Sequence, residues 1–487
     1  MGQELTRDQT LSQQILNDDK GFYYLETGNY PLGDRSLPIG VFDSGIGGLT
    51  VMDAIVNFDG FKNEDLLPGA DGKKDFIEEK FIYLADQANM PYGNYSAENK
   101  QALLREHIIK DVQFLLGKKY YPEGAAPRYN NDKSPVKAIV IACNTATAYG
   151  KETIEDFLTE AGLDIKVIGV IDAGVRGALE IINKDEDATI GVMATVGTVD
   201  SKGYVNTIHT LKQQMGYTGK FQVFQQGGIG IAEAVDEDTD YYDKNLKAPR
   251  KNYKGPGLEG KTKIDKTLLN IYNFDFDKNK MLCDATTPGD CNNLQINDAE
   301  NYVRFHLVSL MEQIKNANTG IPLRSIILGC THYPYLTTEI NEVLDELYNY
   351  KESDGNYRYR EHMSQNINLI DPAVNTAKEL FQYLKEVSLF NQDGEIKESE
   401  FYISVANTDN PGVVVDENGN FPYEYKYGRE EGEIQEYVKV VPFSKSNISD
   451  DILSRLKLQL PYTYELIVNF NEANPKTQIL KQNEKIK

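Results

Sequence analysis

Cysteine is scarce in this chain, and long apolar runs are missing. The 487 residues include four cysteines, which are too few for a disulfide scaffold. No apolar stretch reaches the about 18 residues that a membrane-spanning helix needs, and the segment Met1–Thr6 lacks the basic and apolar parts of a signal peptide. We therefore expect a cytoplasmic protein in which Cys143 and Cys330 stay reduced.

Basic residues are also in deficit. Lys and Arg total 51 against 74 Asp and Glu, which gives a net charge of −23 and disfavours binding to nucleic acid or to an anionic membrane. The same charge repels small anions at long range, so a carboxylate ligand would need a local site of backbone N–H groups and hydroxyls. A chain of this length exceeds one usual core, and two domains of roughly 200 residues each are expected.

The apolar runs that are present are short, and polar residues and a helical stretch follow each of them. Such runs are typical of buried strands in a parallel sheet, joined by crossover helices. They form two series of four: Ile39–Phe42, Phe81–Leu84, Val136–Cys143 and Val167–Ile171, then Thr189–Met193, Phe221–Phe224, Ser325–Cys330 and Ile367–Ile370. The pattern predicts an α/β fold of two similar parallel-sheet domains. Internal duplication would relate them by pseudo-two-fold symmetry around an active-site cleft, although buried-strand patterns also coincide in unrelated halves of large α/β proteins.

The segments outside these series set the predicted domain boundaries. We expect an N-terminal extension over 1–37, a first domain over 38–135 and 136–187 that a helix near 371–390 completes, a second domain over 188–405 with an insertion over 236–297, and a C-terminal extension over 406–487. The insertion is rich in Asp, Lys, Asn, Gly and Tyr, which is typical of a surface loop.

Two features of the added segments carry expectations of their own. Cys283 and Cys291 in the insertion have no neighbouring His or second Cys pair, so unpaired thiols are favoured over a metal site. The C-terminal part holds four apolar segments that are interpreted as strands or extended chain and expected to form a small added subdomain: Phe401–Val405, Gly412–Val415, Tyr437–Val441 and Tyr464–Phe470.

Cys143 and Cys330 stand in nearly the same local frame, each at the end of the third strand of its series. Both would lie at the carboxyl ends of parallel strands, where open α/β sheets bind ligands. Inert core cysteines are common, but Asn144 follows the first thiol, and Thr331 and His332 follow the second. A helix start favours a thiolate at either place, and His332 is the obvious acid–base helper. Two opposed thiols would suit proton transfer on both faces of a carbon.

Turn motifs follow other predicted strands. Asp43–Leu49 contains three glycines whose N–H groups are open to an anion. Their spacing is not Gly-x-Gly-x-x-Gly, so the turn favours a small carboxylate over a pyrophosphate. Pro91-Tyr92-Gly93 and Ala194–Thr198 follow two further strands. An ordinary turn is the simpler interpretation of each one alone, whereas their common placement indicates one rim of hydroxyls and amides.

Taken together, these motifs resemble those of a known family. Ile39–Leu49, Asp86–Gly93, Cys143–Ala146, Thr195–Ser201 and Gly329–Pro334 are similar, in order and at corresponding strand ends, to the motif set of glutamate racemases in the aspartate/glutamate racemase superfamily. The resemblance covers about residues 38–405. The motifs Asp43-Ser44-Gly45 and Cys330-Thr331-His332 resemble those of glutamate racemases more than those of aspartate racemases.

The resemblance implies racemisation of L-glutamate to D-glutamate for peptidoglycan, without a cofactor or metal, in a homodimer. Cys143 and Cys330 would be the two bases, Asp43 would assist Cys143, and His332 would assist Cys330. One thiolate would remove the α-proton while the opposite thiol returns one. The residues that would hold the substrate are Ser44, Pro91, Tyr92, Gly93, Asn144, Thr145, Thr195, Thr198 and Thr331.

The chain departs from the family where a Glu is usual after the sixth strand. It has Gln226 there, and Glu233 or Asp236 could supply the carboxylate instead. The alternatives to a glutamate racemase are a racemase of another small amino acid, such as aspartate, and a non-catalytic amino-acid-binding protein on the same scaffold. A pyridoxal-phosphate enzyme is disfavoured because no Lys stands at a motif strand end.

Overall fold

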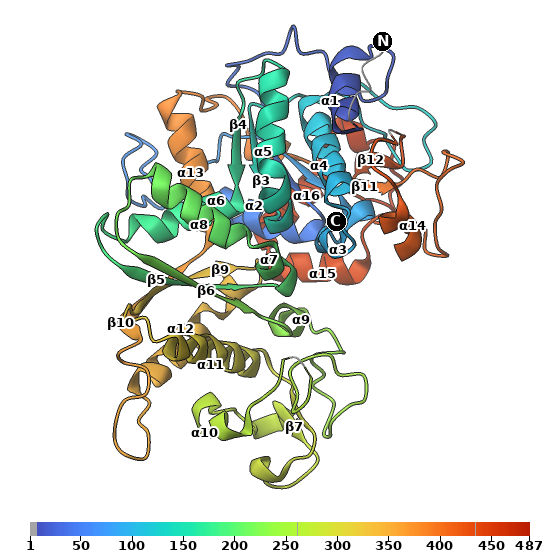
Figure 1. Cartoon of the computed structure of the whole chain (residues 1–487). Helices are drawn as coiled ribbons and strands as arrows, with labels where there is room; N and C mark the ends of the chain where they lie inside the picture. The colour runs from blue at the N-terminus through green and yellow to red at the C-terminus, as the bar shows by residue number, and fades with distance from the viewer. Residues whose placement is uncertain (1–6, 261, 434) are drawn as a thin grey trace, which may run out of the picture. The chain divides into compact units, whose positions relative to one another are not determined.

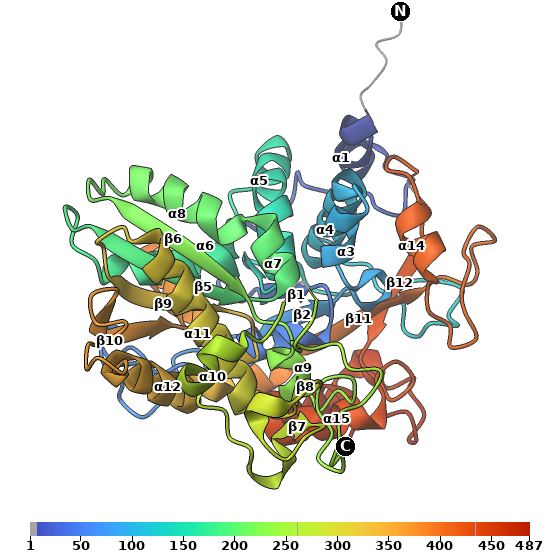
Figure 2. The same ribbon diagram turned by 60° about the horizontal axis from the view of Figure 1, so that its bottom comes forward.

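The computed structural model describes residues 7–260, 262–433 and 435–487, and Figures 1 and 2 show its ribbon from two sides. The chain divides into two compact units. Unit 1 comprises the described residues up to Ala173 together with Ala373–Lys487, and unit 2 is Gly174–Pro372. Among the helices of the described residues, none has both the length and the apolar character needed to cross a membrane.

Unit 1 is built on a six-stranded sheet in the order β12-β11-β2-β1-β3-β4. Its strands are β1 (Ile39–Asp43), β2 (Phe81–Ala85), β3 (Ala138–Ile141), β4 (Lys166–Gly169), β11 (Glu400–Ala406) and β12 (Val438–Pro442). All neighbours run parallel except β12, which is antiparallel to β11. The three central strands β1, β2 and β3 are buried at every position, as near-continuous apolar runs in a parallel sheet should be.

Helices pack around this sheet in two groups. They are α1 (Arg7–Asn17), α2 (Leu49–Val56), α3 (Gly93–Ala97), α4 (Gln101–Leu116), α5 (Asn144–Glu160), α6 (Val170–Glu180, which continues into unit 2), α13 (Pro372–Glu386), α14 (Tyr423–Gly428), α15 (Asp450–Gln459) and α16 (Pro461–Ala473). Helix α4 packs against α5 and α1, whereas α16 packs against α2 and β11 (Figure 1).

Unit 2 has a four-stranded, all-parallel sheet in the order β10-β9-β5-β6. Its strands are β5 (Ala188–Ala194), β6 (Phe221–Gly227), β9 (Leu323–Gly329) and β10 (Met363–Ile370), with a separate hairpin of β7 (Met281–Cys283) and β8 (Leu294–Ile296). Its helices are α7 (Val196–Ser201), α8 (Gly203–Gln214), α9 (Ile231–Val235), α10 (Leu269–Tyr272), α11 (Ala299–Ala317) and α12 (Thr337–Asn349).

The two sheets share one strand order. Numbered along the chain within each series, the strands of unit 1 run 2-1-3-4 through β2-β1-β3-β4, and those of unit 2 run 2-1-3-4 through β6-β5-β9-β10. The prediction of two similar parallel-sheet α/β domains is therefore confirmed. Pseudo-two-fold symmetry and a cleft stay predictions.

The unit boundaries differ from the predicted domain boundaries. The structure assigns 174–187 to unit 2, whereas we had expected the first domain to continue to 187. It assigns 373–405 to unit 1, including most of α13, the helix expected near 371–390. Residues of the predicted C-terminal extension also belong to unit 1.

The described residues of the tail belong to unit 1 rather than to a subdomain of their own. Phe401–Val405 lies in β11 and Tyr437–Val441 largely in β12; β11 pairs with β2 of the first sheet, and β12 pairs with β11 at its edge (Figure 2). The strand expected at Tyr464–Phe470 is wrong, because this segment lies in α16. The buried positions of α16 recur at the three-to-four spacing of a helix: Thr463 and Tyr464, Leu466 and Ile467, Phe470 and Asn471. Residues 412–415 lie in no strand.

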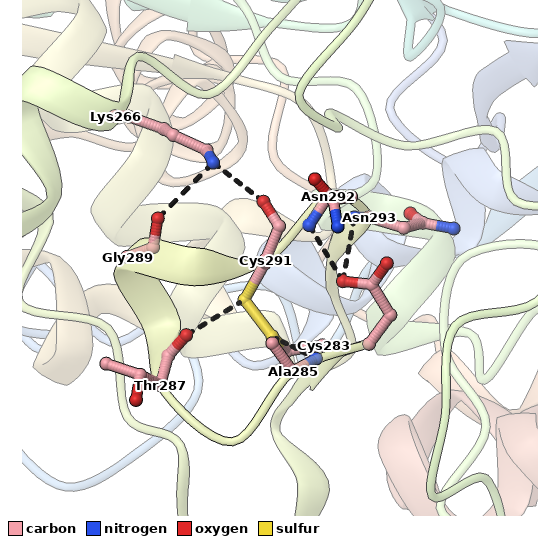
Figure 3. Close-up of a disulfide and its surroundings, with 9 residues drawn as sticks. Lys266, Cys283, Ala285, Thr287, Gly289, Cys291, Asn292 and Asn293 are labelled. Atoms are coloured by element: carbon pink, nitrogen blue, oxygen red, sulfur yellow. Dashed lines mark hydrogen bonds between the residues drawn. A yellow bond between two sulfur atoms is a disulfide. The ribbon is translucent and has the colours of Figure 1, made fainter.

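The expectation of unpaired thiols in the insertion is also wrong. Cys283 and Cys291 form a disulfide with their Cα atoms 5.6 Å apart (Figure 3). Cys283 is the last residue of β7 and pairs with Leu294 of β8, so the hairpin returns the chain toward it. Lys266 Nζ fixes the same turn by donating to the carbonyl oxygens of Cys291 (2.7 Å) and Gly289 (3.4 Å). The residues next to Cys283 and Cys291 in the sequence argue against a metal site, but they contain no signal for this pairing.

Candidate active-site residues in the two units

In unit 1, Asp43 and Cys143 come from neighbouring strand ends. Asp43 is the last residue of β1, whose Phe42 pairs with Ile141 of β3. Ala142 N–H donates to the Phe42 carbonyl (2.9 Å) and carries the alignment one residue beyond the strand. Cys143 then becomes the N-cap of α5. The carboxyl edge of the sheet therefore brings this acid and this thiol together, as the sequence predicted.

The glycine-rich turn after β1 serves Asp43 itself. Gly45 N–H and Gly48 N–H donate to Asp43 Oδ2 at 3.2 and 2.8 Å. A Cβ atom at Gly48 would lie 2.4 Å from the Cβ of Asp43 and 2.9 Å from the Tyr83 hydroxyl, so the turn can close only around glycine. Two of the amides expected to be open to an anion are thus already used within the protein.

The Cys143 thiol is buried among these groups. Its Sγ accepts from Ala146 N–H (3.4 Å) and lies 3.7 Å from Ser44 Oγ. Burial, with a smaller contribution from the negative charge of Asp43, raises the pKa of the Cys143 thiol to about 12. Burial also raises the pKa of Asp43. Cys143 is therefore a protonated thiol at neutral pH. Asn144 and Thr145, in the first turn of α5, are half-buried beside it.

Tyr92 has a different environment from the one expected. Its side chain is 1 % exposed, and its hydroxyl lies 2.6 Å from Asp86 Oδ2 and 2.7 Å from Asp111 Oδ2. Asp86 is also hydrogen-bonded by Ser404 Oγ (2.6 Å). The hydroxyl therefore belongs to a buried network of unit 1, and Pro91, Tyr92 and Gly93 could meet a substrate here only through their main chain or the exposed ring of Pro91.

Replacing Asp111 by asparagine should stabilise unit 1 at neutral pH. Burial raises the pKa of Asp111 well above its usual value, and the charge of Asp86 adds to the shift. The folded state thus binds a proton that the unfolded carboxyl releases above about pH 4, so wild-type stability is lost as pH rises from there. We expect the free energy of unfolding of Asp111→Asn to fall less between pH 5 and pH 8, as measured by denaturant titration. The exposed Asp156→Asn should follow the wild-type curve, and equal slopes in all three proteins would contradict the assignment.

In unit 2, Thr195 and Cys330 occupy corresponding positions on neighbouring strands. Ala194 of β5 pairs with Gly329 of β9, so Thr195 and Cys330 are the first residues beyond the two paired ends. Thr195 caps α7: its Oγ1 accepts from Thr198 N–H (3.4 Å) and donates to Thr198 Oγ1 (3.0 Å). The predicted hydroxyls therefore lie at the same sheet edge as the second thiol.

His332 connects Cys330 to a carboxylate. Its Nδ1 lies 3.7 Å from Cys330 Sγ and 3.5 Å from Thr331 Oγ1, and its Nε2 lies 3.2 Å from Asp236 Oδ1. Burial by itself lowers the pKa of His332, but the hydrogen bonds to Asp236 and Cys330 outweigh it and raise the pKa to about 10. The ring is therefore protonated at neutral pH and carries a positive charge next to the sulfur.

The chain is similar in sequence to curated glutamate racemases. A glutamate racemase from a Sulfurihydrogenibium species is 30% identical over 286 residues, which are 58% of this chain and 84% of that protein. The chain belongs to the glutamate racemase family. The glutamate racemase of Thermoanaerobacter pseudethanolicus is 26% identical over 370 residues, or 76% of this chain and 88% of that protein. The protein is thus an amino-acid racemase, an isomerase.

No family model matches the chain. A solved glutamate racemase isoform from Bacillus anthracis has 22% identity and a TM-score of 0.42, covering 75% of this chain and 87% of that one. The Francisella tularensis glutamate racemase in complex with D-glutamate has 21% identity and a TM-score of 0.39, covering 81% and 95%.

Asp236, rather than Gln226, faces the catalytic candidates of this family member. Gln226 Nε2 lies 3.0 Å from His306 Nδ1, and its Oε1 accepts from Gln313 (2.8 Å), so the side chain is bound to α11. Glu233 Oε2 accepts from Gly230 N–H (2.9 Å) at the start of α9. Asp236 follows α9 directly and reaches His332. The sequence alone does not distinguish these three residues, because a carboxylate that follows the next helix leaves no signal in a strand-end motif.

Proposed function

We propose that this family member interconverts L- and D-glutamate by a cofactor-independent mechanism with two thiol bases, Cys143 and Cys330. The observation that carries the proposal is their equivalence: each follows the third strand of a 2-1-3-4 sheet, and each has its own acid–base partner. Asp43 partners the first thiol and His332 the second. Membership of the glutamate racemase family supports glutamate as the substrate.

The unequal surroundings support opposite resting roles. Cys143 is a buried thiol beside a carboxylate, which suits a proton donor. Cys330 stands beside a protonated imidazole, the charge that a thiolate base requires. In one direction the Cys330 thiolate forms an S–H bond as the Cα–H bond breaks, and the electron pair stays on Cα and its carboxylate. The S–H bond of Cys143 then breaks as a new C–H bond forms on the other face. The reverse direction exchanges these roles.

Donors at the two strand edges would stabilise the carbanion. Charge develops on the α-carboxylate as the proton leaves, and preorganised hydrogen bonds to it are worth most in that state. Ser44, Asn144 and Thr145 are the candidates in unit 1, and Thr195 and Thr331 those in unit 2. We propose these five side chains as substrate ligands, with Thr198 holding Thr195 in place.

Solvent deuterium incorporation tests the proposal. In D₂O, with neither pyridoxal phosphate nor metal added, either enantiomer of glutamate should gain one deuterium at Cα while it racemises, as followed by ¹H NMR and circular dichroism. Unchanged Cα–H intensity from both enantiomers, with glutamate still bound, would instead indicate the non-catalytic binding protein. Faster exchange of aspartate than of glutamate would indicate the other racemase. The carboxylate of Asp236 next to His332 favours the catalytic alternative.

Three broader points belong to the same proposal. The D-glutamate would serve peptidoglycan synthesis, the protein would be a homodimer, and the reaction would take place in the cytoplasm. The Cys283–Cys291 disulfide counts against the cytoplasmic location, because such bonds persist mainly in oxidising compartments. Titrating free thiols in protein isolated under alkylating conditions would establish whether this pair is oxidised in the cell.

A further inference from the structure

Asp236 stands where the family scaffold meets the insertion of this chain. It is the C-cap of α9, and its N–H donates to the Ala232 carbonyl (3.0 Å). It is also the first residue of the predicted insertion over 236–297, and from Glu237 onward the chain leaves the helix. The side chain of Asp236 is about a third exposed, at 30%, so burial alone does not fix the direction in which its carboxylate points.

The first residues of the insertion are held by Arg250, which lies further along it. Arg250 donates from one terminal nitrogen to the Thr239 carbonyl (2.8 Å) and from the other to the Tyr241 carbonyl (2.9 Å). Its own main chain is fixed in both directions by Gln295: Arg250 N–H donates to Gln295 Oε1 (2.9 Å), and Gln295 Nε2 donates to the Arg250 carbonyl (2.8 Å). Gln295 is the middle residue of β8. The guanidinium therefore ties the chain just after Asp236 to the disulfide-linked hairpin.

Two buried side chains complete this attachment. Asn297, which is 2 % exposed, accepts from Asp243 N–H and from Arg250, each at 2.9 Å, and donates to the Asp243 carbonyl (3.0 Å). Tyr302 on α11 is fully buried, and its hydroxyl lies 3.0 Å from the Tyr241 carbonyl. The alternate carbonyls of Thr239, Tyr241 and Asp243 thus accept hydrogen bonds from Arg250, Tyr302 and Asn297.

We infer that Arg250, Asn297 and Tyr302, here called the latch, are positioning residues that aim Asp236 at His332 and so set the charge beside Cys330. The inference rests on the proposed function and deepens it, because the insertion would then control the acid–base pair formed by Cys330 and His332. Asp236 and Cys330 are the titratable groups that bond to His332. Tyr333 lies close to Cys330 in the sequence, and burial, followed by the charges of Cys330 and Glu233, raises the pKa of its hydroxyl well above the usual value.

Substitution of Arg250 by methionine tests the latch. The pKa of His332 is followed by NMR in the full chain, with its signal among the five histidines assigned from His332→Gln. We expect Arg250→Met to lower this pKa, and with it the alkaline limb of kcat/KM for glutamate, by about one to three pH units, the usual effect of losing an adjacent carboxylate. Lys247→Met, which neutralises an exposed cation of the same insertion, should leave both unchanged.

Gentler variants keep the test decisive if Arg250→Met does not fold. Tyr302→Phe removes only the hydroxyl that contacts the Tyr241 carbonyl and should give a smaller shift in the same direction. Arg250→Lys should lower the pKa of His332 by less than Arg250→Met does, because one ammonium can bind one of the two carbonyls but cannot span both. Folded latch variants with the same His332 pKa and pH profile as Lys247→Met would overturn the inference. The proposed function would survive that result, because it is tested separately by deuterium exchange at Cα of glutamate and by alanine variants of Cys143 and Cys330.

Discussion

Alanine at either Cys143 or Cys330 should reduce the racemisation of glutamate by roughly 10³-fold, the scale on which a positioned acid–base group contributes to catalysis. Each variant retains one thiol, so it can still exchange the α-proton on one face of the substrate but cannot invert the carbon. We therefore expect residual deuterium incorporation without inversion, from opposite enantiomers in the two variants. Circular dichroism of glutamate measures inversion, and NMR of the Cα–H signal measures exchange.

The control must remove an equally small buried polar side chain without touching the proposed chemistry. Ser325 offers this. It lies in β9, the strand that leads to Cys330, is fully buried, and its Oγ has no hydrogen-bond partner among the described residues. Ser325→Ala should keep turnover near the wild-type value. Near-normal turnover in both cysteine variants would refute the two-thiol mechanism, whereas a loss in Ser325→Ala as well would point to damage of the sheet.

Much of the fold is predictable from the sequence because the central strands are continuous apolar runs. Residues such as Ile39–Phe42 and Ile326–Leu328 are buried on both faces, and that burial leaves a readable pattern of β-branched and aliphatic residues. The same pattern located the strand ends, and with them Asp43, Cys143, Cys330 and His332. The sequence predicts two similar halves by internal duplication. It does not predict their shared 2-1-3-4 strand order, since that order depends on crossovers that the sequence does not specify.

The features that were missed depend on contacts between distant segments. Strand β11 pairs with β2 although Glu400 and Ile82 are more than 300 residues apart, and no local signal states which sheet a late strand will join. Tyr464–Phe470 is apolar enough for a strand, but in the fold it lies in a helix that packs against α2, α15 and β11. The Tyr92 hydroxyl was assigned to a substrate because its partners, Asp86 and Asp111, become neighbours only when α4 packs beside β2. Asp236 was recognisable as a candidate but not distinguishable from Glu233 without the path of the insertion.

Removing the charge of Lys137 should lower the free energy of unfolding by about 3 to 5 kcal/mol, the usual cost of leaving a buried partner uncompensated. Lys137 Nζ lies 2.7 Å from Glu79 Oε2, and both side chains are 1 % exposed. The ammonium also donates to the carbonyls of Arg35 (2.8 Å) and Leu389 (3.0 Å). Lys137 directly precedes β3, so this cluster anchors the end of the strand opposite to Cys143. Lys137→Met should therefore destabilise unit 1 in denaturant titrations at pH 7.

The pH dependence of this loss separates a buried charge from a simple packing defect. Burial already raises the pKa of Glu79 and lowers that of Lys137, each against the attraction of the other. Without the lysine, the pKa of Glu79 rises further, so the folded state gains a proton that the unfolded chain gives up above about pH 4.3. The penalty of Lys137→Met should then be largest at pH 7 to 8 and shrink toward pH 5.

Adding Glu79→Leu should recover most of the loss, because two apolar groups can replace a buried ion pair at little cost. Lys397→Met, at the exposed pair with Glu395, should change little at any pH. A pH-independent penalty that Glu79→Leu does not relieve would show that the alkyl stem of Lys137, rather than its charge, supports β3.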